Sequence, residues 1–326
     1  MQPVHADIPA TALAWHRAGR GAVLATVVET WGSAPRPVGS QLVVSQTGAF
    51  EGSVSGGCVE GAVVAEAQEV LASGQPRIVT YGVSDDNAFA AGLACGGTIR
   101  VLVEPVGPGA AALSAAQLAA LVAARAARDP VALVVDTETW ARRLEGPNAF
   151  ADRFRADRSG LEEDGKTFIA IHNPPLRLIV VGAVHIAQAL VPMAHLAGID
   201  AVVIDPRSAF ATPHRFADVP LHIDYPDEVL DEIGLDARTA IVVLAHDPKI
   251  DDPGLEAALG SQAFYIGALG STRSHAKRVE RLRARGFSAD QIARIHGPVG
   301  LDIGARGPAE IALAILAELV ARLRKG

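Results

Sequence analysis

The chain has 326 residues, 49% of them hydrophobic and 20% charged, which is the composition of an ordinary globular protein. A length of this order predicts about two domains, each large enough to bury a core. The formal net charge of −7 excludes a general attraction to nucleic acid or to an anionic membrane. An anionic ligand therefore has to be bound by local positive groups, such as arginines or helix N-termini.

The cysteines and the apolar runs indicate the compartment. The two cysteines, Cys58 and Cys95, lie outside any Cys-x-x-Cys pattern and predict neither a disulfide framework nor a zinc site. Both fit a reducing compartment. The first residues lack the basic and apolar regions of a signal peptide, and the long uncharged run 105–124 is too weakly hydrophobic to span a bilayer. We expect a cytoplasmic protein that contacts neither membrane nor nucleic acid.

The first half of the chain mixes helices and strands without regular alternation. Hydrophobic periodicity predicts helices at 11–18, 59–71 and 114–128. Strands are expected at 22–29, 42–45, 52–54, 77–81, 98–104, 131–136 and 167–172. The stretch 139–165 is charged and irregular. Asn173-Pro174-Pro175 then interrupts any regular structure, so we place the domain boundary there, with domains at 1–173 and 174–326.

The second half alternates strand and helix. Strands are expected at 177–181, 201–205, 221–223, 240–245 and 264–266, and helices at 185–196, 227–233, 254–259, 273–285 and 308–323. Such alternation indicates a parallel sheet with helices on both faces. The predicted fold class is α/β: a mixed α/β N-terminal domain followed by a Rossmann-like, doubly wound C-terminal domain.

The segment Ser55-Gly56-Gly57-Cys58 precedes the second predicted helix. Its glycines allow a sharp turn and a close approach of a ligand to the backbone. Cys58 is expected in the first helical turn, where free N–H groups and the helix dipole favour a thiolate. The alternative is that Cys58 is a small buried hydrophobic residue. Cys95-Gly96-Gly97 repeats the pairing of cysteine with glycines and leads into a strand.

The second domain carries part of a dinucleotide fingerprint. The strand ending at 181 runs into Gly182 and a helix, and Asp205 closes the next strand at the spacing of the acid that binds a ribose hydroxyl. Val184 stands where the second glycine should allow the pyrophosphate to approach. The fold is therefore indicated, whereas NAD(P) is not expected.

Three further groups follow strands of the second domain. His246 and Asp247 should reach the crevice at the carboxyl edge of the sheet, unless they are only solvated residues at a strand end. Ser271 and Arg273 open a helix and form a candidate anion site, although Ser271 could be a cap alone. Asp302 lies in the long loop 296–308, which could wrap a ligand, bind a partner or brace two domains.

Several of these motifs together resemble one family. Gly32-Ser33-Ala34-Pro35-Arg36, Gly56-Gly57-Cys58-Val59-Glu60, Cys95-Gly96-Gly97, Gly270-Ser271 and Gly300-Leu301-Asp302-Ile303-Gly304 resemble, in order and over nearly the whole chain, the xanthine dehydrogenase accessory family (XdhC/CoxI). The resemblance implies a maturation factor that binds the molybdenum cofactor, protects it while a cysteine desulfurase replaces an oxo ligand by sulfur, and delivers it to a molybdenum hydroxylase apoenzyme. The chain departs from the family at Val184 and at Ala245, where the family commonly has glycine and threonine.

The motifs and the resemblance together define the expected site. Cys58 and Cys95 are the thiols expected to carry the chemistry, and Cys58 is also expected to contact molybdenum. The residues expected to bind the cofactor are Gly32, Ser33, Arg36, Gly56, Gly57, Gly96, Gly97, Gly182, His185, Asp205, His246, Asp247, Ser271, Arg273 and Asp302. The glycine loops and Arg36 would hold the cofactor's phosphate, and a thiolate would ligate molybdenum or carry sulfur.

The expected cargo is molybdopterin or its cytosine dinucleotide form, and the expected partners are the apoenzyme, the desulfurase and a second copy of the chain. We expect a carrier without independent turnover. An NAD(P)-dependent oxidoreductase, with His246 or His185 as acid–base, and a docking protein with two inert cysteines are the alternatives.

Overall fold

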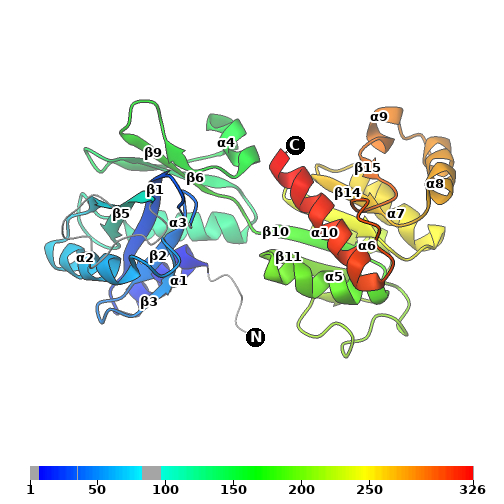
Figure 1. Cartoon of the computed structure of the whole chain (residues 1–326), viewed down its shortest axis with the longest axis horizontal. Coiled ribbons are helices and arrows are strands. Elements are labelled where there is room, and N and C mark those ends of the chain that lie inside the picture. Colours follow the sequence, from blue (N-terminus) through cyan, green and yellow to red (C-terminus); the bar gives the residue numbers. More distant parts are fainter. Residues whose placement is uncertain (1–6, 35, 83–96, 326) are drawn as a thin grey trace. The chain divides into compact units, whose positions relative to one another are not determined.

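The structure is a computed structural model that describes residues 7–34, 36–82 and 97–325. Its contacts divide the chain into two compact units, Met1–Pro174 and Pro175–Gly326 (Figure 1). No helix of the described residues is long and apolar enough to cross a membrane.

The first unit is built on a five-stranded antiparallel sheet with the strand order β3-β2-β1-β5-β4. Its strands are β1 (Val23–Trp31), β2 (Gln41–Val44), β3 (Phe50–Gly52), β4 (Arg77–Tyr81) and β5 (Thr98–Pro105). Alternate residues of β1 belong to two different buried clusters, one shared with helix α2 (Glu60–Ser73) and the other with α1 (Ile8–Arg17) and α3 (Ala115–Ala126). The near-continuous apolar run of β1 follows from this burial on both faces.

A second sheet of the first unit has the order β7-β6-β9-β8. It consists of β6 (Val131–Asp136), β7 (Arg142–Glu145), β8 (Gly160–Leu161) and β9 (Thr167–His172). The expectation that 139–165 is irregular is wrong, because β7, β8, the 3-10 helix η2 (Pro147–Ala149) and α4 (Ala151–Ala156) lie there. These elements are too short and too polar to show a hydrophobic period.

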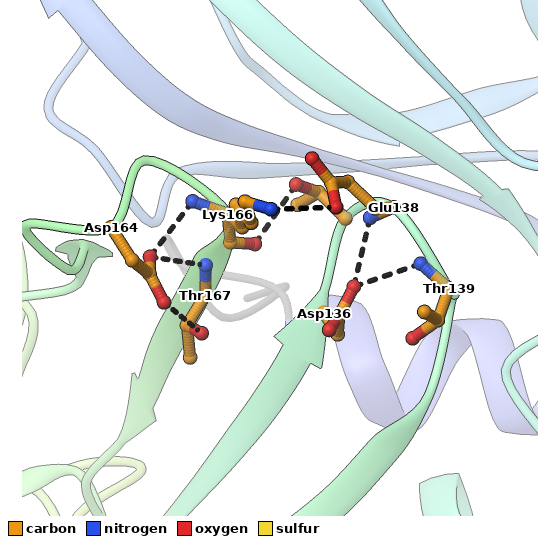
Figure 2. Close-up of polar contacts among 7 residues, drawn as sticks. Asp136, Glu138, Thr139, Asp164, Lys166 and Thr167 are labelled. Atoms are coloured by element: carbon orange, nitrogen blue, oxygen red, sulfur yellow. Dashed lines mark hydrogen bonds and ion pairs between the residues drawn. The ribbon is translucent and has the colours of Figure 1, made fainter.

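Two aspartates close the turns at the end of β6 and before β9, as Figure 2 shows. Asp136 Oδ1 accepts from the N–H groups of Glu138 and Thr139, at 2.9 and 2.8 Å. Asp164 Oδ1 accepts from those of Lys166 and Thr167, both at 2.8 Å. Lys166 Nζ then bridges the two turns by donating to Glu138 Oε2 at 2.9 Å. Side chains that bond their own turns in this way have a structural role.

The second unit is a six-stranded parallel sheet with the order β12-β11-β10-β13-β14-β15, which is typical of dinucleotide-binding domains. The strands are β10 (Leu176–Val181), β11 (Ile199–Ile204), β12 (Leu221–His222), β13 (Thr239–Val243), β14 (Tyr265–Ala268) and β15 (Ile295–His296). The predicted fold class is confirmed.

Helices cover both faces of this sheet (Figure 1). One buried cluster joins the sheet to α5 (His185–Leu196) and α10 (Pro308–Lys325), and a second joins the other face to α6 (Pro226–Ile233), α7 (Pro248–Leu259) and α8 (Thr272–Ala284). A short helix, α9 (Ala289–Ile292), precedes β15.

Helix α7 begins at Pro248 rather than at residue 254. Asp247 is its N-cap and Pro248 its first residue, a strong start signal that outweighs Pro253 inside the helix.

Candidate functional site

The described glycine-rich segments of the first unit share one buried cluster. Trp31 at the end of β1 pairs with Thr98 at the start of β5. Gly97 packs on the preceding turn so closely that a Cβ there would lie 2.7 Å from the Ser33 carbonyl oxygen. Val54 and Val59 are buried in the cluster, and Ala34 packs against it. The fold thus gathers Gly32, Ser33, Gly97 and the loop 53–59 around Cys58, whereas Cys95 and Gly96 lie outside the described residues.

The expected position of Cys58 is wrong, and so is the alternative that it is buried. Helix α2 begins at Glu60 with Val59 as its N-cap, so Cys58 precedes the helix instead of lying in its first turn. Gly56 and Gly57, with φ of 78° and 118°, extend the turn and delay the helix start. Cys58 is also exposed, which excludes its interpretation as a buried hydrophobic residue.

The Glu60 carboxylate lies inside the loop 53–59, which we call the Cys58 loop. Its Oε1 accepts from Ser53 Oγ at 2.7 Å and from the N–H groups of Val54 and Ser55 at 3.2 and 3.0 Å. Its Oε2 accepts from Ser55 Oγ and from the Gly57 N–H, the latter at 2.9 Å. Burial acts to raise the pKa of Glu60, but the hydrogen bonds from Ser55 and Ser53 and from backbone N–H groups lower it to about 2.

The other N–H groups of the Cys58 loop are satisfied by the two serines. Gly56 donates to Ser53 Oγ at 2.9 Å, and Cys58 and Val59 donate to Ser55 Oγ at 3.1 and 2.9 Å. Every N–H from 54 to 59 therefore already has an acceptor within the chain. The expectation that the backbone of Gly56 and Gly57 holds a phosphate is corrected, because those donors are taken.

Arg36 differs from the donors of the Cys58 loop. Its side chain is exposed, and it forms no ion pair with any residue that the structure describes. It remains available to an anionic ligand. The described residues contain no group of three or more histidine, cysteine, aspartate or glutamate side chains arranged to hold a metal ion.

In the second unit, the Asp205 carboxylate accepts hydrogen bonds from the chain itself. Oδ2 accepts from the Ala183 N–H at 2.8 Å and from Arg207 Nη2 at 2.7 Å, and Oδ1 accepts from the N–H and Nε of Arg207 at 2.9 and 2.8 Å. Four donors fill the acceptor capacity of a carboxylate. The side chain is fully buried, and although burial acts to raise its pKa, these hydrogen bonds from Arg207 and Ala183 lower it. The expected role of Asp205 in binding ribose is not supported by this geometry.

A pocket of about 370 Å³ lies at the carboxyl edge of β10 and β13. Val184, Leu244, Leu269 and Ile311 are among its apolar lining residues, which also include His185 and His246. Val184 has an ordinary φ of −88°, so its backbone does not require glycine, and it is the side chain that occupies the space. Gly182 does require glycine, because a Cβ there would lie 2.7 Å from the Ala245 nitrogen.

The remaining predicted residues have structural roles or are exposed. Asp247 caps α7 by accepting from the Lys249 N–H at 3.0 Å, and Ser271 caps α8 by accepting from the Ser274 N–H at 3.2 Å. A Cβ at Gly270 would lie 3.8 Å from the His246 ring, so the α8 turn is next to the crevice. Arg273 and Asp302 are exposed.

Three charged residues of these sites were not predicted from the sequence: Glu60, Arg207 and Asp251. An acidic residue in the first turn of a helix after two serines was the available signal for Glu60. Asp251 Oδ1 accepts from the Ala245 N–H at 3.1 Å, and burial raises the pKa of Asp251 to about 6. Only the folded structure shows that burial.

The fold and the site define a two-unit α/β protein with an exposed thiol on an internally bonded glycine loop and a largely apolar crevice in a Rossmann-like unit. A family model described as the XdhC Rossmann domain matches residues 178–319, and one described as the XdhC and CoxI family matches residues 15–82. The chain belongs to the XdhC/CoxI family.

Two relatives match over most of their length. The molybdenum cofactor insertion chaperone PaoD of Escherichia coli K12 is 34% identical over 303 residues, covering 92% of this chain and 83% of that protein. A probable xanthine dehydrogenase component from Bacillus subtilis 168 is 29% identical over 319 residues, covering 92% of each. A crystal structure described as a xanthine dehydrogenase of Bacillus halodurans superposes with a TM-score of 0.75 and 27% identity, covering 98% of this chain and 96% of that one.

Proposed function

We propose that this chain is a maturation factor that holds the molybdenum cofactor as cargo, supports its sulfuration and delivers it to a molybdenum hydroxylase. The observation that carries the proposal is the exposed Cys58 thiol on a loop whose backbone donors are all satisfied within the chain. A relative whose name is molybdenum cofactor insertion chaperone, 34% identical over 92% of the chain, supports the class of cargo.

The residues of the first unit supply complementary chemistry for such a cargo. A thiolate is a soft ligand that suits molybdenum and can carry sulfur. The exposed guanidinium of Arg36 suits the phosphate of molybdopterin or of its cytosine dinucleotide form. The proposal includes a cysteine desulfurase as sulfur donor, the apoenzyme as acceptor, a homodimeric state, a cytoplasmic location and no independent turnover.

The test is anaerobic purification of the full chain from a molybdenum-replete host. We expect pterin and molybdenum to copurify in equal amounts, below one per chain. Absence of both would contradict the proposal, and tight NAD binding with dehydrogenase activity would favour the oxidoreductase instead.

Coexpression with the client hydroxylase tests the thiols. Cys58→Ser is expected to lower the client's cyanide-labile sulfur or molybdenum by more than about tenfold, because serine lacks the soft ligand and sulfur carrier. Cys95→Ser is the matched variant and is expected to have a smaller effect. Full sulfuration of the client with Cys58→Ser would remove the thiol from the mechanism.

A further inference from the structure

The Cys58 loop is shaped around an anion that the chain itself supplies. Successive N–H groups that converge on one point form a concave anion-binding site. Here the converging donors of Val54, Ser55 and Gly57 meet the carboxylate of Glu60, which is only 6% exposed. The position that a bound phosphate or carboxylate would take is already filled.

Glu60 does more than cap a helix. In a capping box a glutamate bonds one N–H group. Glu60, the first residue of α2, accepts five hydrogen bonds, all from residues that precede the helix. This number indicates that the carboxylate organises the loop as well as the helix start.

The two serines extend the network to the thiol. Ser55 Oγ donates to Glu60 and accepts from the Cys58 N–H at 3.1 Å and from the Val59 N–H at 2.9 Å. Ser53 Oγ also donates to Glu60 and accepts from the Gly56 N–H. The Cys58 N–H is thus connected to the Glu60 carboxylate through one intervening group, the Ser55 hydroxyl.

We propose that Glu60 is a positioning residue for cofactor handling: it holds the Cys58 loop in its working shape before cargo binds, with the Cys58 thiol outward. This inference rests on the proposed function. The Cys58 loop contributes the thiol sulfur, and a different group binds the phosphate of the cargo. A loop that already has its shape loses little conformational entropy when cargo arrives.

The test compares Glu60→Gln with Glu69→Gln in the full chain. Both substitutions remove one negative charge from α2, but Glu69 is 66% exposed and pairs only with Arg77 among the described residues. Amide hydrogen exchange of the cargo-free protein is the first measurement. We expect E60Q to lose protection at Val54, Ser55 and Gly57 by on the order of 10- to 100-fold more than at β1 and β5, and E69Q to lose none.

Copurified pterin is the second measurement. E60Q should retain at least about tenfold less pterin than the wild type, equivalent to ~1.4 kcal/mol. E69Q should retain the wild-type amount. Glu60→Asp, which keeps the charge on a shorter side chain, should recover part of the retention. If E60Q loses protection equally across the whole first unit, the Ser53→Ala variant is tested in its place. That substitution removes one hydrogen-bond donor to Glu60 and keeps the negative charge of the carboxylate.

The outcomes separate this inference from the proposed function. Equal pterin in the wild type and in E60Q, with loop protection lost, would overturn the positioning role alone. Unchanged loop protection in E60Q would also overturn it. A wild-type chain without pterin would overturn the proposed function and the positioning role with it.

Discussion

A glycine loop leads into a helix in each unit, and each loop donates at least one backbone N–H group to a buried carboxylate. In the first unit Glu60 belongs to the helix that follows the loop, and the exposed thiol remains beside it. In the second unit Asp205 comes from the end of the next strand and is also held by Arg207. The first arrangement leaves a thiol exposed to solvent, whereas in the second the acid itself is buried. Two similar sequence patterns therefore indicate a shared way of satisfying backbone donors and not a shared ligand.

The largest expected loss of stability comes from substitution of Glu60. Glu60→Gln places an amide N–H₂ against donors that need an acceptor, and should destabilise the first unit by about 2–4 kcal/mol. Glu69→Gln, on the same helix but exposed, should change stability by less than about 0.5 kcal/mol. Chemical denaturation of the full-length variants measures both. Equal effects would show that the Cys58 loop does not depend on Glu60.

Lowering the pH should destabilise the protein by protonating Glu60. The pKa of Glu60 is about 2 in the folded chain and has an ordinary value of 4.5 when unfolded. Its contribution, about 3 kcal/mol, is complete above pH 4.5 and is lost as the pH falls towards 2. The unfolding free energy of the wild type should fall more steeply than that of Glu60→Gln over this range. Parallel curves would contradict the low pKa.

Asp251 in the second unit should show the opposite dependence. Burial raises its pKa to about 6 from an ordinary value of 3.8, so its stabilising contribution is complete below pH 3.8 and is lost as the pH rises through 6. Asp251→Asn keeps an acceptor for the Ala245 N–H and stays neutral. We expect it to be about 2–3 kcal/mol more stable than the wild type at pH 8 and equal to it within about 0.5 kcal/mol at pH 4. Arg278 carries a positive charge that acts to lower the pKa of Asp251, and a destabilised variant at pH 8 would show that this charge stabilises the ionised carboxylate.

Titration with NAD tests whether the saturated Asp205 carboxylate, and not only the Val184 side chain, prevents nucleotide binding in the second unit. Val184→Gly removes the side chain from the pocket, yet Asp205 stays saturated by Arg207, so NAD affinity should rise by less than about threefold. Adding Arg207→Ala frees two of the four acceptor positions of Asp205, and affinity should then rise by about tenfold. Calorimetry measures both, with circular dichroism as the check on folding. Tight NAD binding by the unmodified chain would refute this interpretation of the crevice.

The smallest expected change in stability comes from substitution of Cys58. Because the side chain is exposed, Cys58→Ser should change the free energy of unfolding by less than about 0.5 kcal/mol. A thermal melt of the cargo-free protein measures this change. A larger loss would mean that the thiol packs against the loop, and reduced client activation by this variant could then reflect folding.

Periodicity was sufficient for the fold class and insufficient for the sites. The second unit follows from alternating apolar strands and helices, since the buried residues of β10 divide between two clusters. The site depends on where side chains bond, which periodicity does not contain. Ser53 and Ser55 look like turn residues in the sequence, yet they connect Glu60 to three backbone N–H groups. Asp205 has the spacing of a ribose-binding acid, but Arg207, two residues later, and the Ala183 N–H give its carboxylate other partners.

The exposure of Cys58 also determines how the protein has to be handled. Gly57 has no Cβ to cover the approach, and the Cys58 side chain is open to solvent. In air we expect the cargo-free protein to form sulfenic acid at this sulfur and then a disulfide-linked dimer, which thiol reductants reverse. A non-reducing gel would show the dimer band in the wild type and not in Cys58→Ser. Any molecular mass measured without reductant would therefore describe the oxidation of the sample and not its native assembly.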